Sequence, residues 1–176
     1  MIGSQSIFLV GPMGSGKTAV GKQIARLLRF PFIDSDREIE TRTGADIALI
    51  FEREGEAGFR KREREAIAEL TARTGVVLAT GGGAVLDAGN RRLLAERGWV
   101  VYLETSVAQQ VERAGRSNHR PLLIGADPRQ RLEELMRIRE PLYREIADFI
   151  ATTTRKRVSP VAERIVQAYR ASSMQP

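Results

Sequence analysis

The fold of this chain is decided near its start, by the stretch Ser6-Ile7-Phe8-Leu9-Val10-Gly11-Pro12-Met13-Gly14-Ser15-Gly16-Lys17-Thr18. Its second part fits the pattern G-x-x-x-x-G-K-[ST], with an apolar run before it and helix-forming residues after it. Glycines let backbone N–H groups approach phosphate oxygens, Lys17 can reach the β- and γ-phosphates, and the Thr18 hydroxyl can ligate Mg²⁺. The alternative is a glycine-rich turn with a surface lysine. The flanking strand and helix favour a nucleotide-phosphate loop.

Apolar runs and helical patterns alternate along the rest of the chain. We expect strands at Ser6–Val10, Phe30–Ile33, Val76–Ala79, Trp99–Leu103 and Phe149–Thr152. We expect helices at Ala19–Leu28, Arg37–Arg42, Ile47–Glu54, Glu56–Thr74, Asn90–Arg97, Val107–Gly115, Pro128–Glu145 and Pro160–Ala171. Pro141 should end or kink the helix that contains it. Strands joined by helical crossovers predict an α/β fold, with a five-stranded parallel sheet and helices on both faces.

Length and composition limit the class of protein. The chain has 176 residues and no cysteine. This is about the size of one domain, and a disulfide framework or a thiolate metal site is excluded. No signal peptide and no apolar run of membrane-spanning length is present. We therefore predict a single-domain protein of the cytoplasm with no membrane partner.

The net charge of +6 raises the question of a nucleic-acid partner. Acidic residues alternate with the basic ones in Glu38–Glu69 and Arg129–Glu145, as on solvated helix surfaces. The chain carries no nucleic-acid-binding motif. A cleft for small anionic substrates explains the positive charge with fewer assumptions, so we predict no nucleic-acid partner.

The residues that follow each predicted strand should meet at one edge of the sheet. Asp34 and Asp36 follow the second strand and alternate along an extended segment, so their side chains should point to opposite sides. One could support Mg²⁺ through water, and the other could orient an attacking hydroxyl or accept its proton. The alternative is a helix N-cap at Ser35 or Asp36. Gly81-Gly82-Gly83 follows the third strand and suggests a close approach of backbone to ligand, rather than only a flexible turn.

A series of motifs along the chain resembles the shikimate kinase family. It consists of Gly11-x-x-Gly14-x-Gly16-Lys17-Thr18, Asp34-x-Asp36-x-x-Ile39-Glu40, Gly55-Glu56-x-x-Phe59-Arg60-x-x-Glu63, Gly81-Gly82-Gly83, Val101-Tyr102-Leu103, Arg120-Pro121-Leu122 and Arg139-x-x-x-Tyr143. Related small-molecule kinases share the phosphate loop but not this combination. The resemblance runs from about Ile7 to Tyr143 and weakens beyond.

The resemblance implies a P-loop fold like that of nucleoside-monophosphate kinases, with strand order 2-3-1-4-5 and a mobile lid. It implies one kinase domain over residues 1–176, with the phosphate loop at 11–18, a shikimate-binding region at about 34–62 and the lid at about 115–126. The implied reaction is ATP-dependent, Mg²⁺-assisted phosphorylation of the 3-hydroxyl of shikimate, in chorismate and aromatic amino acid biosynthesis. The partners are shikimate and ATP, and the enzyme is expected to be a monomer.

The resemblance also implies a role for individual residues. Lys17, Asp36 and Arg120 are the expected catalytic residues, with Arg120 reaching from the lid. Thr18 is expected to ligate Mg²⁺, with Asp34 in the outer shell. Shikimate is expected to contact Asp36, Arg60, Gly82, Gly83 and Arg139. ATP is expected to contact Gly14, Ser15, Gly16, Lys17, Thr18, Ala19, Arg113, Arg120 and Arg157.

The sequence leaves two alternative functions open. The chain could be another P-loop kinase, such as a gluconate kinase relative, although an acceptor without a carboxylate would not need both Arg60 and Arg139. It could also be a non-catalytic nucleotide-binding module, which the intact Lys17, Thr18, Asp36 and Arg120 disfavour. His119, the only histidine, is expected on the lid surface.

Overall fold

The computed structural model describes residues 5–114, 127–153 and 157–174. Its centre is a five-stranded parallel sheet in the order β2-β3-β1-β4-β5. The strands are β1 (Ser6–Val10), β2 (Phe32–Asp34), β3 (Val77–Ala79), β4 (Gly98–Glu104) and β5 (Phe149–Thr152). The α/β fold class, the parallel sheet and its order are thus confirmed.

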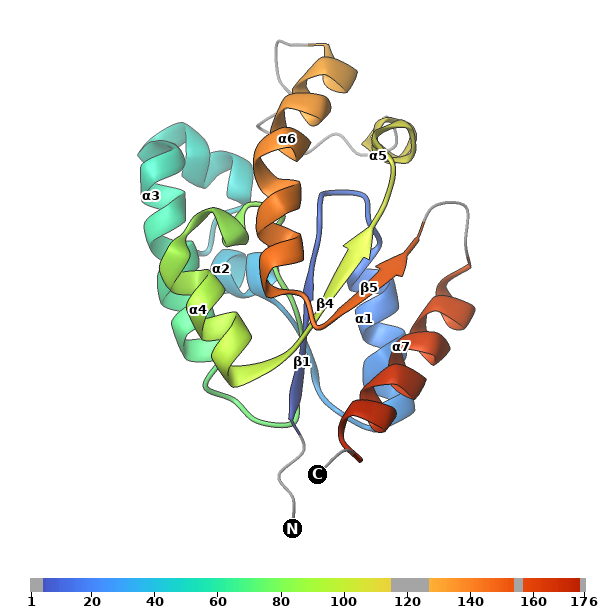
Figure 1. Cartoon of the computed structure of the whole chain (residues 1–176). Helices are drawn as coiled ribbons and strands as arrows, with labels where there is room; N and C mark the ends of the chain where they lie inside the picture. The colour runs from blue at the N-terminus through green and yellow to red at the C-terminus, as the bar shows by residue number, and fades with distance from the viewer. Residues whose placement is uncertain (1–4, 115–126, 154–156, 175–176) are drawn as a thin grey trace.

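Helices cover both faces of this sheet (Figure 1). One face carries α1 (Lys17–Leu28) and α7 (Val158–Ser172). The other carries α2 (Ser35–Thr43), α3 (Ile47–Leu70), α4 (Ala88–Arg97) and α6 (Pro128–Ile146). A short 3-10 helix, η1 (Ala84–Leu86), precedes α4, and α5 (Val107–Ala114) follows β4.

The side chains of β1 show how one strand serves two cores. Ile7 and Leu9 pack with α1 and α7, whereas Phe8 and Val10 pack with α2, α3, α4 and α6. All four side chains are fully buried. A strand that is covered on both faces has to be apolar at every position, which explains the continuous apolar run that precedes the phosphate loop.

Gly55 and Pro141 have different effects on the helices that contain them. The helices expected on either side of Gly55 are observed, because Gly55 has φ 69° and ψ −178° and breaks α3 there. The helix predicted at Pro128–Glu145 is confirmed as α6, which does not end at Pro141 but continues past it to Ile146. Tyr143 and Ile146 pack in the core beyond the proline, and their burial offsets the backbone hydrogen bond that Pro141 cannot make.

The order and direction of the strands determine where the candidate site lies. In parallel strands all carboxyl ends lie at the same edge, and the loops after β1, β2 and β3 therefore come together there. The strands β4 and β5 point their carboxyl ends toward α5 in Figure 1. Within the described residues, no helix combines the length and the apolar character needed to span a bilayer.

Candidate active site

A cavity of about 500 Å³ lies at the carboxyl ends of β1, β2 and β3. It contains most of the site residues that the sequence predicted. Those in its lining are Gly14, Gly16, Lys17, Thr18, Ala19, Asp34, Asp36, Arg60, Gly82, Gly83 and Arg139. Ser15 is fully buried in the same loop but does not line the cavity.

The phosphate loop ends at the N-terminus of α1. Gly16 caps this helix in the left-handed conformation, at φ 89°, and no side chain caps the helix amides. Lys17 Nζ donates to the carbonyl oxygens of Gly11 at 2.7 Å and Pro12 at 2.8 Å, which holds the ammonium group over the loop. Uncapped helix amides and a fixed ammonium group together favour an anion at this point.

Asp34 connects the phosphate loop to α2. Its Oδ2 accepts a hydrogen bond from Thr18 Oγ1 at 3.0 Å. Its Oδ1 accepts from the backbone N–H groups of Asp36 and Arg37, so that Asp34 is the N-cap of α2. The alternative of a cap at Ser35 or Asp36 therefore misplaces the cap by one or two residues.

Asp36 lies in the first turn of α2, and not in the extended segment that the alternation suggested. The extended segment ends earlier than expected, because Asp34 is the N-cap of a helix that begins at Ser35. Burial is the main cause that raises the pKa of Asp36 to about 7, and the negative charges of Glu63 and Asp34 add to it. The carboxyl group is thus suited to hold or accept a proton near neutral pH.

The half-buried Arg60 and the buried Glu63 form an ion pair one turn apart on α3. Arg60 Nη1 lies 2.7 Å from Glu63 Oε2, and Glu63 is only 1% exposed. Burial by itself would lower the pKa of Arg60, but Glu63 and Glu56 raise it above its ordinary value. Burial raises the pKa of Glu63, although Arg60 and Arg139 oppose this. The pair keeps the Arg60 guanidinium charged and fixed at the cavity wall.

The three consecutive glycines form the part of the wall against which the charged groups pack. A Cβ added to Gly81 would lie 2.7 Å from Asp36 Oδ1 and 2.9 Å from Glu63 Oε1. One added to Gly83 would lie 2.6 Å from Arg60 Nη1. A side chain at Gly81 or Gly83 would displace the carboxylates or the guanidinium, which explains why these two positions are glycine.

Arg139 enters the cavity from α6 and is 4% exposed. Burial is the main cause that lowers its pKa below the ordinary value, and the positive charge of Arg60 contributes. The two guanidinium groups reach one cavity from residues that are far apart in the sequence. Two forked cations in a half-enclosed space can bind a planar carboxylate.

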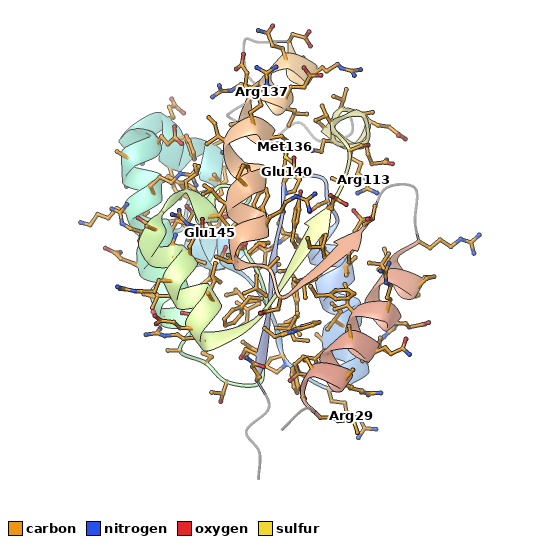
Figure 2. All side chains as sticks on the ribbon, viewed as in Figure 1. Arg29, Arg113, Met136, Arg137, Glu140 and Glu145 are labelled. Carbon is orange, nitrogen blue, oxygen red and sulfur yellow. The ribbon has the colours of Figure 1, made fainter. Side chains whose placement is uncertain are left out.

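Two further predicted residues lie outside the cavity lining, and others fall outside the described part of the chain. Arg113, labelled in Figure 2, is on α5 and donates to the Gly14 carbonyl, which places it beside the phosphate loop but outside the cavity lining. Arg157 is exposed at the N-cap of α7 and does not line the cavity. Arg120, His119 and the expected lid at about 115–126 lie outside the described residues.

Comparison with known proteins identifies the family. The model of the shikimate kinase family matches residues 13–170. The chain belongs to the shikimate kinase family. It is 55% identical to the shikimate kinase of Methylococcus capsulatus over 168 residues, which cover 96% of this chain and 94% of that protein. It is 57% identical to that of Halorhodospira halophila over 162 residues, 92% of each chain.

A solved structure of the shikimate kinase family has the same fold over nearly the whole length. The enzyme of Acinetobacter baumannii, in complex with shikimate, superimposes with a TM-score of 0.95 at 49% identity, covering 98% of this chain and 96% of that chain. Family membership makes this chain a kinase, and the P-loop kinase fold expected from the motifs is confirmed.

Two residues of the shikimate kinase site had no assigned role in the sequence analysis. Glu63 was quoted only as part of a motif, although its spacing of three residues from Arg60 on a predicted helix indicated an ion pair. Tyr143 was also quoted without a role. Its contact with Gly82 joins residues 61 positions apart, which no local pattern indicates.

Proposed function

We propose that this chain transfers the γ-phosphoryl group of ATP to the 3-hydroxyl of shikimate, which gives shikimate 3-phosphate and ADP. The observation that carries the proposal is one cavity lined by Lys17, Asp36, Arg60 and Arg139. A phosphate-binding loop, a group that can accept a proton and a carboxylate-binding pair are the three parts that this reaction needs.

We assign the nucleotide side of the cavity to the phosphate loop. Gly14, Ser15, Gly16, Thr18 and Ala19 would contact the phosphates through the loop and the first turn of α1. Lys17 would stabilise the negative charge that develops during transfer, and Arg120 would do so from the lid. The adenine would lie near Arg113 and Arg157.

The donor groups near the phosphate loop fit Mg²⁺. Thr18 Oγ1 and Asp34 Oδ2 are hard oxygen ligands 3.0 Å apart. No group of three or more carboxylate, histidine or cysteine side chains that could hold a metal occurs among the described residues, as suits an ion held mainly by phosphates and water. Thr18 would bind the ion directly and Asp34 through water. When bound, Mg²⁺ neutralises charge on the β- and γ-phosphates.

On the acceptor side, Asp36 would orient the 3-hydroxyl and take its proton. The hydroxyl oxygen forms a bond to the γ-phosphorus while the bond to the bridging oxygen of ADP breaks, and the released proton passes to the Asp36 carboxylate. The pKa of Asp36, raised to about 7, suits such a transfer near neutral pH.

Arg60 and Arg139 would bind the carboxylate of shikimate, assisted by the backbone N–H groups of Gly82 and Gly83. Both glycines line the cavity, and the two arginines approach the glycine loop from different helices. This pair distinguishes the proposal from a kinase for a polyol without a carboxylate, which would not need a buried and a half-buried guanidinium group in one cavity.

We further propose that the enzyme acts as a cytoplasmic monomer without a nucleic-acid or membrane partner. The phosphate loop, Asp36 and the arginine pair are all supplied by one chain, so the proposed site needs no residue of a second copy. The absence of cysteine suits a reducing compartment.

A coupled assay of ADP release tests the proposed reaction. The substrate panel contains shikimate, shikimate methyl ester, gluconate and nucleoside monophosphates, each with ATP and Mg²⁺. We expect turnover with shikimate, and little with the ester, because the ester lacks the negative charge that the arginines bind. Turnover of gluconate or a nucleoside monophosphate in place of shikimate would refute the proposal.

The arginine pair is tested in the same assay. Arg60→Ala or Arg139→Ala should raise the KM for shikimate by roughly tenfold or more, with little change for ATP, since each removes a charged hydrogen bond. Arg62→Ala is the matched control, because Arg62 is on the same helix but pairs with Glu54 outside the cavity. Equal effects of all three changes would place the carboxylate site elsewhere.

A further inference from the structure

We propose that Tyr143 is a positioning residue for the carboxylate site, because its hydroxyl holds the glycine loop in place beside Arg139. This inference rests on the proposed function and adds a residue to it. Tyr143 does not line the cavity and would not touch the substrate. It would act through the groups that do.

The first contact is with the glycine loop. Tyr143 is completely buried on α6, and its hydroxyl donates to the carbonyl oxygen of Gly82. None of the described peptide bonds is cis, so the Gly82 carbonyl and the Gly83 N–H point to opposite sides of one planar peptide unit. A bond that holds the carbonyl therefore also fixes the direction of the Gly83 N–H.

The glycine loop needs such a restraint. Glycine restricts its backbone less than any other residue, so the peptide planes of three consecutive glycines would rotate easily without outside contacts. At the start of the loop, the Gly81 N–H donates to Ser35 Oγ at 3.1 Å. At its end, the Ala84 N–H donates to the Gly81 carbonyl. Tyr143 supplies the contact at the centre, on the Gly82 carbonyl.

The second neighbour is Arg139, one helical turn before Tyr143 on α6. Tyr143 is among the groups that influence the pKa of the Arg139 guanidinium. The Tyr143 side chain therefore interacts electrostatically with Arg139, while its hydroxyl donates to the Gly82 carbonyl. A Cβ added to Gly82 would lie 3.6 Å from Arg139 Nη1, which shows how closely these two elements approach.

A second tyrosine gives a matched control. Tyr102 on β4 stacks on Tyr143 with ring centroids 5.1 Å apart, and it is equally buried. Its hydroxyl has no hydrogen-bond partner among the described residues. Removal of either hydroxyl leaves the stacked rings in place, but only removal of the Tyr143 hydroxyl breaks contacts with the carboxylate site.

The test compares Tyr143→Phe with Tyr102→Phe in the ADP-release assay. We expect Tyr143→Phe to raise the KM for shikimate by about three- to tenfold, as for one lost hydrogen bond, with kcat and the KM for ATP changed by less than about twofold. It should also reduce the preference for shikimate over its methyl ester. Tyr102→Phe should leave all these quantities as in the parent. A parent-like KM and ester preference in Tyr143→Phe would overturn the proposal, as would an equal rise in the KM for ATP.

A measurement on the unchanged sequence keeps the test independent of folding. The chain has three tyrosines, so a protein with ¹³C at the tyrosine Cζ gives few signals, which the Phe variants assign. Saturating shikimate should change the ¹³C chemical shift of Tyr143. The chemical shift of Tyr169 should stay the same, because its hydroxyl donates to the Gln5 carbonyl, far from the site. An unchanged Tyr143 signal would overturn the proposal. A parent without shikimate-dependent ADP release would instead refute the proposed function.

Discussion

Asp36→Asn should stabilise the folded protein at slightly alkaline pH while it removes activity. Asp36 Oδ1 is shielded from solvent and has no hydrogen-bond partner among the described residues. Burial, together with the charges of Glu63 and Asp34, raises its pKa from 3.8 to about 7. The ionised form is therefore unfavourable in the folded state, and an uncharged amide of nearly the same shape avoids this cost.

The sign and size of the effect follow from linkage. Because the pKa is higher in the folded state, the folded state binds more protons between about pH 4 and pH 7, and this stabilisation is lost as the pH rises. Each unit of pKa difference corresponds to about 1.36 kcal/mol. The contribution of Asp36 to the free energy of unfolding of the parent should therefore fall by about 2 to 3 kcal/mol between pH 5 and pH 8. Asp36→Asn should not lose this contribution.

The assay is urea unfolding of parent and variant at about pH 5 and pH 8, without ATP, shikimate or Mg²⁺. The advantage of Asp36→Asn over the parent should grow by about 2 to 3 kcal/mol between the two pH values. Asp34→Asn is the control: its carboxylate caps α2 and accepts from Thr18, so the variant should lose up to about 1 kcal/mol at pH 8. A pH-independent difference, or a less stable Asp36→Asn at pH 8, would refute the reasoning.

Three further changes test other parts of the site. Lys17→Met should lower kcat/KM by about a hundredfold or more in the ADP-release assay, since a fixed charge at the phosphates is lost, and a few-fold loss would contradict the role. Gly83→Ala should raise the KM for shikimate, because the new methyl would lie 2.6 Å from Arg60 Nη1, and an unchanged KM would mean that the guanidinium moves at no cost. Asp34→Asn should raise the Mg²⁺ concentration needed for half-maximal rate, and a parent-like Mg²⁺ titration would reduce Asp34 to a helix cap.

The sequence predicted well those structural elements that depend on residues close together in the chain. The run Ser6–Val10 coincides with β1, and the phosphate loop leads into α1 as expected. The break at Gly55 was also visible, because only glycine adopts its positive φ readily. The sheet order came from the resemblance to a family, since strand patterns alone do not specify which strands are neighbours.

Specific contacts decided two places where local preference pointed elsewhere. Pro141 was expected to end or kink the helix predicted at Pro128–Glu145, and the burial of Tyr143 and Ile146 continues α6 beyond it. Asp36 was placed in an extended segment because D-x-D alternation resembles a strand, whereas the Asp34 cap starts α2 before it. At Asp36 the sequence indicated a common local structure, and the contact of the Asp34 side chain with the backbone decided otherwise.

The sequence by itself determined the sheet-and-helix pattern and the phosphate loop, because spacing and residue type carry that information. The resemblance to the shikimate kinase family added the arginines and glycines expected around the cavity. Only the tertiary structure decided the electrostatics of the site. The pKa of Asp36 depends on its burial beside Glu63 on another helix, and the direction of the Gly83 N–H on a hydroxyl 61 positions beyond Gly82. Both depend on distances across the fold, which exist only once the layers have packed.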